Sequence, residues 1–433
     1  MNLRILEGTV RKVKWTEKTF LSNAYPGALT HWIDNFYGDG SWDYGVVIRS
    51  KTYSQCTAAL HDLEFAQTKR FSFSRLKNWH FYRYQIYNLL RMKYKPVIAL
   101  LLFSSLIGDT FSQFPDIEKL MAENNIICTG LGIIKNGKLT TNSVYGELKQ
   151  GTPAPKNTVF NVASMTKPVV AMLTLTLVNS NQWNLDEPLA KYWTDPDVAS
   201  DPRSKKLTSR HVLTHQTGFV NWRWLHPTKK LTFDVDPGTK FGYSGEGFEY
   251  LKKALENKFK KSLVQLVQEY IFDPLQMKDS RLIWNDSIEY RYAANHNGEG
   301  KAVYKTVKRT EASAADDLIT TVEDYSKLCI AIMNGFGLDK KIYEDMVTPH
   351  VETKKSVFMG LGWLVIPLSN NEYVIGHDGG DEGVKTIALF NPVSKDGLIF
   401  LTNSDNGFAI APKVFSEMMP NGPEIVKKMT GKE

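Results

Sequence analysis

The chain has 433 residues, of which 42% are hydrophobic and 23% are charged, a balance typical of a folded globular protein rather than a disordered one. The formal net charge of +7 would suit a nucleic-acid or membrane-surface partner, but the basic excess lies entirely in residues 1–95. The remaining residues are close to neutral, so we expect no nucleic-acid partner, and the length allows one large domain or two ordinary ones.

The most apolar stretch covers residues 96–107 and follows two lysines. A secretory signal peptide has a short basic region, then about twelve apolar residues and then small residues. A membrane span, in contrast, needs about 20 apolar residues. We therefore predict that translation starts at Met92, that residues 92–112 are a signal peptide, and that the mature protein is periplasmic or secreted without a stable membrane span. Residues 1–91 show no sustained helical or alternating period, and we interpret them as an upstream start or as disordered. The alternatives for the apolar stretch are a signal-anchor and a buried helix of a cytoplasmic protein.

From residue 113 onward, the pattern predicts strands at both ends of the chain and helices between them. Asn136-Gly137, a strong hairpin signal, separates two β-rich runs at 126–134 and 139–148. The almost wholly apolar residues 164–178 predict a helix that is buried on all sides. We expect further helices at 114–124, 246–259, 262–272, 324–334 and near 412–419, followed by a polar tail, and strands at 362–367, 373–376, 384–390 and 397–402.

This order of elements indicates one sheet built from both ends of residues 113–433. The predicted fold is an α/β (α+β) sandwich, in which helices flank an antiparallel sheet. We expect a mainly helical subdomain, inserted at about residues 180–340.

Little in the sequence points to redox or metal chemistry. The cysteines Cys56, Cys128 and Cys329 are too few for a disulfide framework, and no two of them have the CxxC spacing. Cys128 and Cys329 stand in apolar runs and are predicted to be buried, with a disulfide between them as an open alternative. His211 and His215 have a spacing that a metal site can use, but no third ligand is evident, so we expect no metal and no cofactor.

The first chemical motif is a serine and a lysine three residues apart, Ser164 and Lys167, at the start of the predicted buried helix. On a helix, such side chains lie on the same face about one turn apart. A serine hydroxyl is a weak nucleophile until a neighbour takes its proton, and a desolvated lysine amine can do so. The helix start also offers backbone N–H groups to a developing oxyanion. The spacing alone is weak, because Ser74 and Lys77 share it without an apolar helix behind them.

Two further motifs lie in predicted turns or at strand ends. Tyr243 follows a Pro-Gly turn on a tight bend and could relay a proton if a nearby cation lowers its pKa; the alternative is an aromatic packed in the core. Residues 376–380, Gly-His-Asp-Gly-Gly, end a predicted strand, where glycines allow close backbone approach and an N–H group could donate to an oxyanion. The alternative for residues 376–380 is a hairpin turn.

These motifs, in this order and spacing, resemble the family of class C β-lactamases, serine DD-peptidases and related esterases. Ser164 and Lys167 match its S-x-x-K motif. Tyr243-Ser244-Gly245 resembles its Y-x-N motif, and His377-Asp378-Gly379 resembles the H-x-G variant of its K-T-G motif. The resemblance covers about residues 120–420 and includes the turn at 207–218 and the paired strands at 384–403.

The resemblance implies an acyl-enzyme on Ser164, with Lys167 and Tyr243 sharing the general base and acid duties. It places the N–H groups of Ser164 and Gly380 in an oxyanion hole. His377 would stand where the family has a lysine that contacts a substrate carboxylate. The implied substrate-binding residues are His377, Asp378, Gly379 and Gly245.

The departures from the family pattern bear on the substrate. Gly245 replaces the asparagine whose side chain contacts the acyl amide of penicillins and peptides. His377 is largely neutral at pH 7, and Asp378 adds a negative charge beside it. Asp316 and Asp317 fall where related chains usually carry small residues. These features favour an esterase or a D-amino-acid peptidase over a dedicated β-lactamase.

The sequence thus predicts an exported serine hydrolase that acts on an ester, a peptidoglycan-type D-amino-acid peptide or, weakly, a β-lactam. The alternative is a non-catalytic receptor for cell-wall fragments on the same scaffold. Trp222 and Trp224 could line an aromatic substrate cleft, although packed loop anchors are the commoner role of such tryptophans.

Overall fold

The computed structural model describes residues 2–3, 29–36, 42–49 and 115–431. The chain forms two compact units, Met1–Ser112 and Gln113–Glu433. In the first unit, the described residues form a three-stranded antiparallel sheet in the order β1 (Asn2–Leu3), β3 (Trp42–Arg49) and β2 (Leu29–Phe36). The expected signal peptide at 92–112 lies outside the described residues. Among the helices of the described residues, none has the length and apolarity that a bilayer crossing requires.

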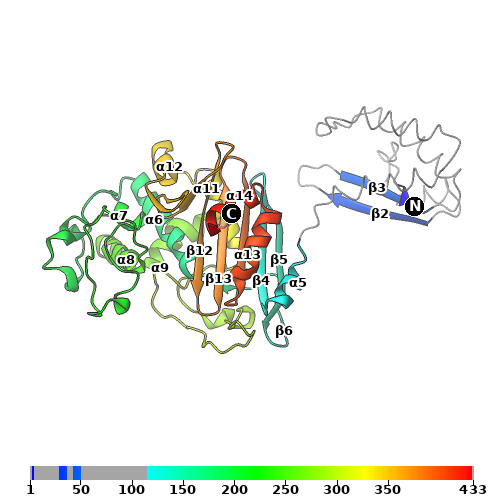
Figure 1. The fold of residues 1–433 in the computed structure, drawn as a ribbon, viewed down its shortest axis with the longest axis horizontal. Coiled ribbons are helices and arrows are strands. Elements are labelled where there is room, and N and C mark those ends of the chain that lie inside the picture. Colours follow the sequence, from blue (N-terminus) through cyan, green and yellow to red (C-terminus); the bar gives the residue numbers. More distant parts are fainter. Residues whose placement is uncertain (1, 4–28, 37–41, 50–114, 432–433) are drawn as a thin grey trace. The chain divides into compact units, whose positions relative to one another are not determined.

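A nine-stranded antiparallel sheet forms the centre of the second unit (Figure 1). Its middle joins the start of the unit to its end, because β4 (Cys128–Lys135) pairs with β14 (Asp396–Thr402). The prediction of one sheet made from both ends of this unit is therefore confirmed. Beyond β4, toward one edge of the sheet, lie β5 (Lys138–Lys149) and β6 (Thr152–Pro153). Beyond β14, toward the other edge, lie in order β13 (Val384–Asn391), β12 (Tyr373–Asp381), β11 (Leu364–Pro367), β10 (Val357–Met359) and β9 (Val351–Lys354).

The hairpin between β4 and β5 has the turn that the sequence predicts. Asn136 and Gly137 both have positive φ, 51° and 73°, as a two-residue turn matched to the twist of its strands requires. Lys135 and Lys138 pair directly on either side of the turn. Local turn chemistry is therefore sufficient to set this register.

Helices cover both faces of the large sheet, and the side chains of β14 show why. Leu398 and Phe400 belong to one hydrophobic core, and Ile399 and Leu401 belong to the other, as the alternation along a strand dictates. The first core is covered by α5 (Ile117–Glu123), α13 (Gly407–Met418) and α14 (Gly422–Thr430), and the second by α6 (Thr166–Asn179) and α11 (Val322–Met333). The predicted sandwich is confirmed.

Between the two groups of strands, helices alternate with long loops and turns. The helices are α7 (Ser209–Leu213), α8 (Gly245–Phe259), α9 (Leu263–Val267), α10 (Asp273–Leu275) and, after α11, α12 (Lys340–Val347). The helix expected at 262–272 is divided, because a π-helical turn at Gln268–Phe272 follows α9. Two short strands, β7 (Phe160–Asn161) and β8 (Ile319–Thr320), pair separately from the large sheet.

Several elements differ from the prediction. The expected polar tail instead forms α14, which buries Ile425 among the side chains of α13 and therefore depends on a tertiary contact. α13 begins at Gly407, before the predicted start. Cys128 and Cys329 are fully buried, as predicted, and both thiols are free; burial raises the pKa of each.

Candidate active site

Ser164 lies in a tight turn directly before the buried helix. The turn, Ala163–Met165, is a 3-10 turn, so α6 starts at Thr166, two residues later than predicted. Ala163 has a φ of 47°, which is uncommon for a residue with a side chain. Two hydrogen bonds hold it there: its N–H donates to Asn161 Oδ1 at 2.7 Å, and its carbonyl accepts from Thr166 Oγ1 at 2.7 Å. The turn presents a half-buried Ser164 side chain.

A buried polar bridge fixes this turn to a distant segment. Asn161 Nδ2 donates to Asp317 Oδ1 at 3.1 Å, and Arg309 forms an ion pair with the same aspartate. The backbone N–H of Leu318 donates to Thr166 Oγ1 at 2.9 Å. Asp317, which departs from the small residues expected here, is therefore an anchor of the serine turn. No sequence pattern pointed to Asn161 or Arg309, although Asn161 stands three residues before the serine.

Lys167 contacts the serine from the first turn of α6. Its Nζ donates to Ser164 Oγ at 3.0 Å and to the carbonyl of Ala315 at 2.7 Å, and only 1% of the residue is exposed. Burial lowers its pKa to about 8, against the opposing negative charges of Asp316, Glu249 and Asp378. A lysine with this pKa is partly neutral near neutral pH and can then accept a proton.

Tyr243 completes a three-residue cluster. Its phenol lies close enough to Ser164 to interact with it, and Lys167 Nζ lies 4.8 Å from the centre of its ring. Burial raises the pKa of Tyr243, so the phenol stays protonated. The condition named above, a pKa lowered by a nearby cation, is not met at Tyr243, because desolvation outweighs the other influences on the phenol.

His215 is buried and packs against Tyr243. Its ring stacks on Tyr243 with centroids 4.3 Å apart, and its Nδ1 accepts the N–H of Ser244 at 3.1 Å. Burial holds its pKa well below the usual value, so the ring is neutral. The Nδ1 atom of His211 likewise accepts a backbone N–H, that of Thr208. Within residues 115–431, the one close group of potential metal ligands is Asp316, Asp317 and Asp381, of which Asp317 is already engaged with Arg309 and Asn161.

Strand β12 passes close to the serine turn. A Cβ atom on Gly379 would lie 2.2 Å from the carbonyl oxygen of Val162 and 3.2 Å from the backbone nitrogen of Ser164, so only glycine fits. Gly380 is exposed, and the nearest atom to a Cβ there would be 3.7 Å away. Strand β11 pairs only with residues 373–376 of β12. Within residues 115–431, no strand therefore pairs with residues 377–381 on the side of β12 that faces β11. The alternative of a hairpin turn at 376–380 is excluded, because β12 continues to Asp381.

His377 offers no positive charge to a ligand. It is 2% exposed, its Nδ1 lies 2.5 Å from the carbonyl oxygen of Asp378, and burial lowers its pKa to about 4. Its ring centre is 6.3 Å from that of Tyr243. The partly exposed Asp378 adds a carboxylate to the same region. The imidazole is thus neutral at pH 7, as expected from the sequence.

Gly245 is the first residue of α8, and its surroundings differ from the expected pattern. Its N–H donates to Asn221 Oδ1 at 2.8 Å. A Cβ atom on Gly245 would lie 2.6 Å from the ring of Trp222, which is half-buried. Trp222 stacks on Trp224, which is 55% exposed. One of the two tryptophans is therefore packed, and the other faces solvent.

A family profile described as Beta-lactamase matches residues 116–414, well over half of the chain. The chain belongs to the beta-lactamase family. The beta-lactamase profile covers the serine turn, Tyr243 and β12. Among its relatives, "Protein flp" of Staphylococcus aureus (strain MW2) is 21% identical over 330 residues, which cover 70% of this chain and 64% of that protein. The chain therefore spans less than two thirds of the length of this relative.

Solved structures of the beta-lactamase fold agree with this assignment. A D-alanine carboxypeptidase AmpC from Burkholderia cenocepacia superposes with a TM-score of 0.61 at 18% identity, covering 71% of this chain and 97% of that one. A D-amino acid amidase from Ochrobactrum anthropi SV3 gives a TM-score of 0.56 at 21% identity, covering 66% and 88%. The family resemblance and the fold inferred from the sequence motifs are confirmed.

Proposed function

We propose that this chain is a serine hydrolase that forms an acyl-enzyme on Ser164. The observation that carries the proposal is the cluster in which Ser164 Oγ lies 3.0 Å from the buried amine of Lys167 and interacts with the phenol of Tyr243. Membership of the beta-lactamase family and fold relatives named carboxypeptidase and amidase support it.

In the acylation step, the neutral amine of Lys167 takes the proton of Ser164 Oγ as this oxygen bonds to the substrate carbonyl carbon. The carbonyl π electrons move to its oxygen, and the N–H groups of Ser164 and Gly380 stabilise the oxyanion. When the bond to the leaving group breaks, protonated Tyr243 donates its proton to the departing atom and regains one from the Lys167 ammonium. Water then attacks the acyl-serine in the reverse sense, releasing the acid and restoring the hydroxyl of Ser164.

The charges near the cluster favour a substrate without a carboxylate beside the reacting bond. His377 is neutral, and the carboxylates of Asp316 and Asp378 both act on Lys167. When Lys167 is in its neutral, proton-accepting form, a negative substrate group would meet repulsion there rather than a cation. The proposed substrates are therefore esters, or D-amino-acid peptides whose reacting bond has no carboxylate beside it, and β-lactams, which carry such a carboxylate, are expected to react weakly.

Replacing the nucleophile tests this proposal. Ser164→Ala is expected to lower the turnover of p-nitrophenyl acetate by about 1,000-fold or more, because no acyl-enzyme can form. A fluorophosphonate should add one adduct to the wild-type chain and none to the variant, measured by intact mass. Ser180→Ala, on an exposed serine at the end of α6, is the control. A folded Ser164→Ala protein with unchanged turnover would refute the proposal.

A receptor for cell-wall fragments is the second candidate function, motivated by the departures at Gly245 and Asp378. It predicts binding of such fragments without any covalent adduct from penicillin or a fluorophosphonate. Adduct formation in the wild-type chain separates the two candidates.

We also propose that residues 113–433 are the mature, exported domain, periplasmic or secreted, and that residues 92–112 direct its export. The N-terminal sequence of the protein from its native host tests this, with a start near Gln113 as the expected result. An intact Met1 in cytoplasmic protein would contradict it.

A further inference from the structure

The space above Gly245 adjoins the proposed nucleophile. Ser244 has an extended backbone, with φ −142° and ψ 116°, so the side-chain positions of Tyr243 and Gly245 point to the same side. The Ser244 hydroxyl turns the other way and donates to the carbonyl of Val220 at 2.9 Å. Because the phenol of Tyr243 interacts with Ser164, a side chain at position 245 would point toward the region that receives a substrate.

The indole of Trp222 occupies this space. A Cβ atom on Gly245 would lie 2.6, 2.7 and 2.9 Å from three carbons of its six-membered ring. An asparagine at position 245 would therefore collide with the indole. Where the family pattern has a carboxamide, this chain presents the hydrocarbon edge of an aromatic ring.

Trp224 extends this apolar surface to solvent. The two indoles stack almost parallel, with centroids 4.7 Å apart and an interplanar angle of 10°. Trp224 is 55% exposed and Leu225 is 63% exposed. Adjacent exposed apolar side chains of this size often mark a binding surface.

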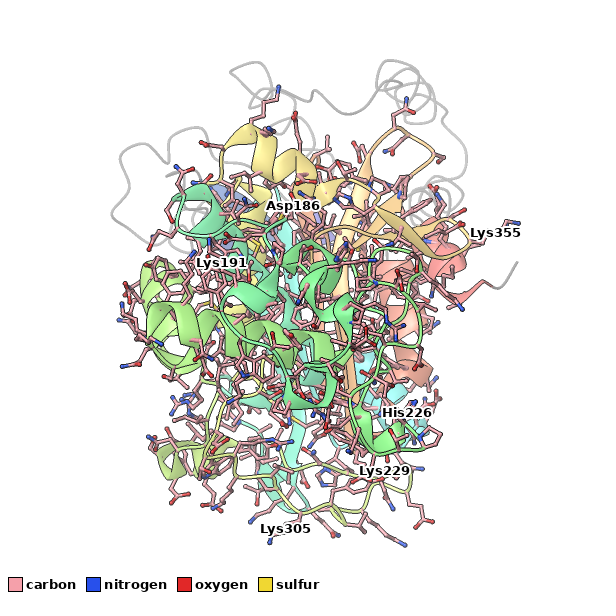
Figure 2. The ribbon with its side chains drawn as sticks, turned by 90° about the vertical axis from the view of Figure 1, so that its left-hand side faces the viewer. Asp186, Lys191, His226, Lys229, Lys305 and Lys355 are labelled. Carbon is pink, nitrogen blue, oxygen red and sulfur yellow. The ribbon has the colours of Figure 1, made fainter. Side chains whose placement is uncertain are left out.

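The loop that carries the tryptophans is held rigidly. Between them, Arg223 donates from its backbone and its guanidinium to Glu246 at 2.9–3.1 Å, and its guanidinium also contacts Asp195 at 2.8 Å and Asp197 at 3.1 Å. Lys229, which lies at the surface in Figure 2, donates to the carbonyl of Trp224 at 2.6 Å. A wall fixed in this way loses little conformational entropy when a ligand packs on it.

We propose that Trp222 and Trp224 form an apolar wall for the acyl group of the substrate, so that the enzyme prefers aromatic or alkyl acyl groups over acyl groups that carry an amide. This inference rests on the proposed acyl-enzyme and specifies the acyl side of its substrate. The wall favours an aryl or alkyl ester, because neither indole face offers a partner for an amide carbonyl.

The test compares two p-nitrophenyl esters that share a leaving group, the acetate and the phenylacetate. Trp224→Ala is expected to reduce the ratio of kcat/KM for phenylacetate over acetate by about tenfold, mainly through KM. Tyr290→Ala removes another exposed aromatic, 72% exposed, and should leave the ratio unchanged. An unchanged ratio in Trp224→Ala would overturn the inference.

A second variant tests the space above Gly245. The double variant Trp222→Ala/Gly245→Asn removes the indole and supplies the family's carboxamide. Its preference for the p-nitrophenyl ester of N-acetylglycine over the phenylacetate should rise by about tenfold or more. Gly245→Asn alone should instead lower the melting temperature, because the indole still fills the space. A preference unchanged in the double variant would overturn the inference.

Fluorophosphonate labelling of Ser164, measured on every variant, separates the two levels of the proposal. If wild-type protein is labelled and turns over the esters while the ratios do not respond, the wall is refuted and the hydrolase stands. If wild-type protein is neither labelled nor active, both are refuted.

Discussion

The serine turn (Ala163–Met165) and the tryptophan loop (residues 221–225) both lie next to the Tyr243-Ser244-Gly245 segment, but they are built in opposite ways. The serine turn is surrounded by buried polar groups that satisfy one another, including Asn161, Lys167 and Asp317. The tryptophan loop exposes the apolar side chains of Trp224 and Leu225 and is fixed by the ion pairs of Arg223.

This difference suits the two regions to different roles, the serine turn to catalysis and the tryptophan loop to the recognition of a substrate. Buried polar groups are costly unless each has a partner, so few arrangements other than the observed one can hold the nucleophile. An exposed apolar surface can change with a smaller loss of stability. The chain accordingly retains the serine–lysine motif of its family and departs from the family pattern at Gly245.

Among variants near the serine turn, the one that removes the amine of Lys167 should have the largest effect on activity. Lys167→Met is expected to reduce kcat for p-nitrophenyl acetate by about 1,000-fold or more, because Ser164 loses its base. Lys340→Met, at an exposed lysine, is the control. Retention of more than a tenth of the wild-type kcat would show that another group takes the proton.

The same variant has an expected effect on stability. The pKa of Lys167 is about 8 in the folded protein and near 10.5 in the unfolded chain, so the unfolded chain binds more protons between these values. The buried lysine therefore costs the folded state up to about 3 kcal/mol below pH 8, a cost that disappears above pH 10.5. The melting temperature of Lys167→Met at pH 7 should consequently be equal to or above that of the wild type.

Breaking the bridge behind the serine should have a smaller effect. Asn161→Ala removes the hydrogen bonds to Ala163 and Asp317, and should lower kcat by about tenfold to 100-fold with little change in KM, because the nucleophile loses its fixed position. The free energy of unfolding should fall by about 1–3 kcal/mol. Asn257→Ala, on an exposed asparagine, should change neither quantity. An unaltered kcat would mean that the bridge does not position Ser164.

The smallest expected effect is a displacement of the pH profile. The kcat/KM of the wild type should rise with pH through about 8, as Lys167 loses its proton. The carboxylate of Asp316 raises this pKa, so Asp316→Asn should move the rise to lower pH. Glu269→Gln, on an exposed residue, should not move it. A rise that stays in place or moves to higher pH would exclude this role of Asp316.

Features governed by neighbouring residues could be predicted from the sequence. Asn136-Gly137 was sufficient for the hairpin, because both residues tolerate positive φ. The apolar run after Ser164 was sufficient for the buried helix α6. The spacing of Ser164 and Lys167 was sufficient for their contact, because helical geometry fixes the distance between such positions.

Individual side-chain contacts between distant segments could not be predicted, although the joining of both ends in one sheet could. The bridge from Asn161 to Asp317 and the indole of Trp222 above Gly245 join parts of the chain that no local pattern connects. The raised pKa of Tyr243 could not be predicted for the same reason, since the extent of burial is a property of the assembled fold. α14 forms because α13 offers its apolar side chains.

The pairing of β4 with β14 also determines when the molecule can fold. Thr129 lies opposite Thr402, so the middle of the sheet cannot close until nearly the whole domain has left the ribosome. Contacts between such distant residues slow folding and leave strand edges bare meanwhile. Until its last strand arrives, the nascent chain therefore holds a half-built sheet that needs protection from other chains.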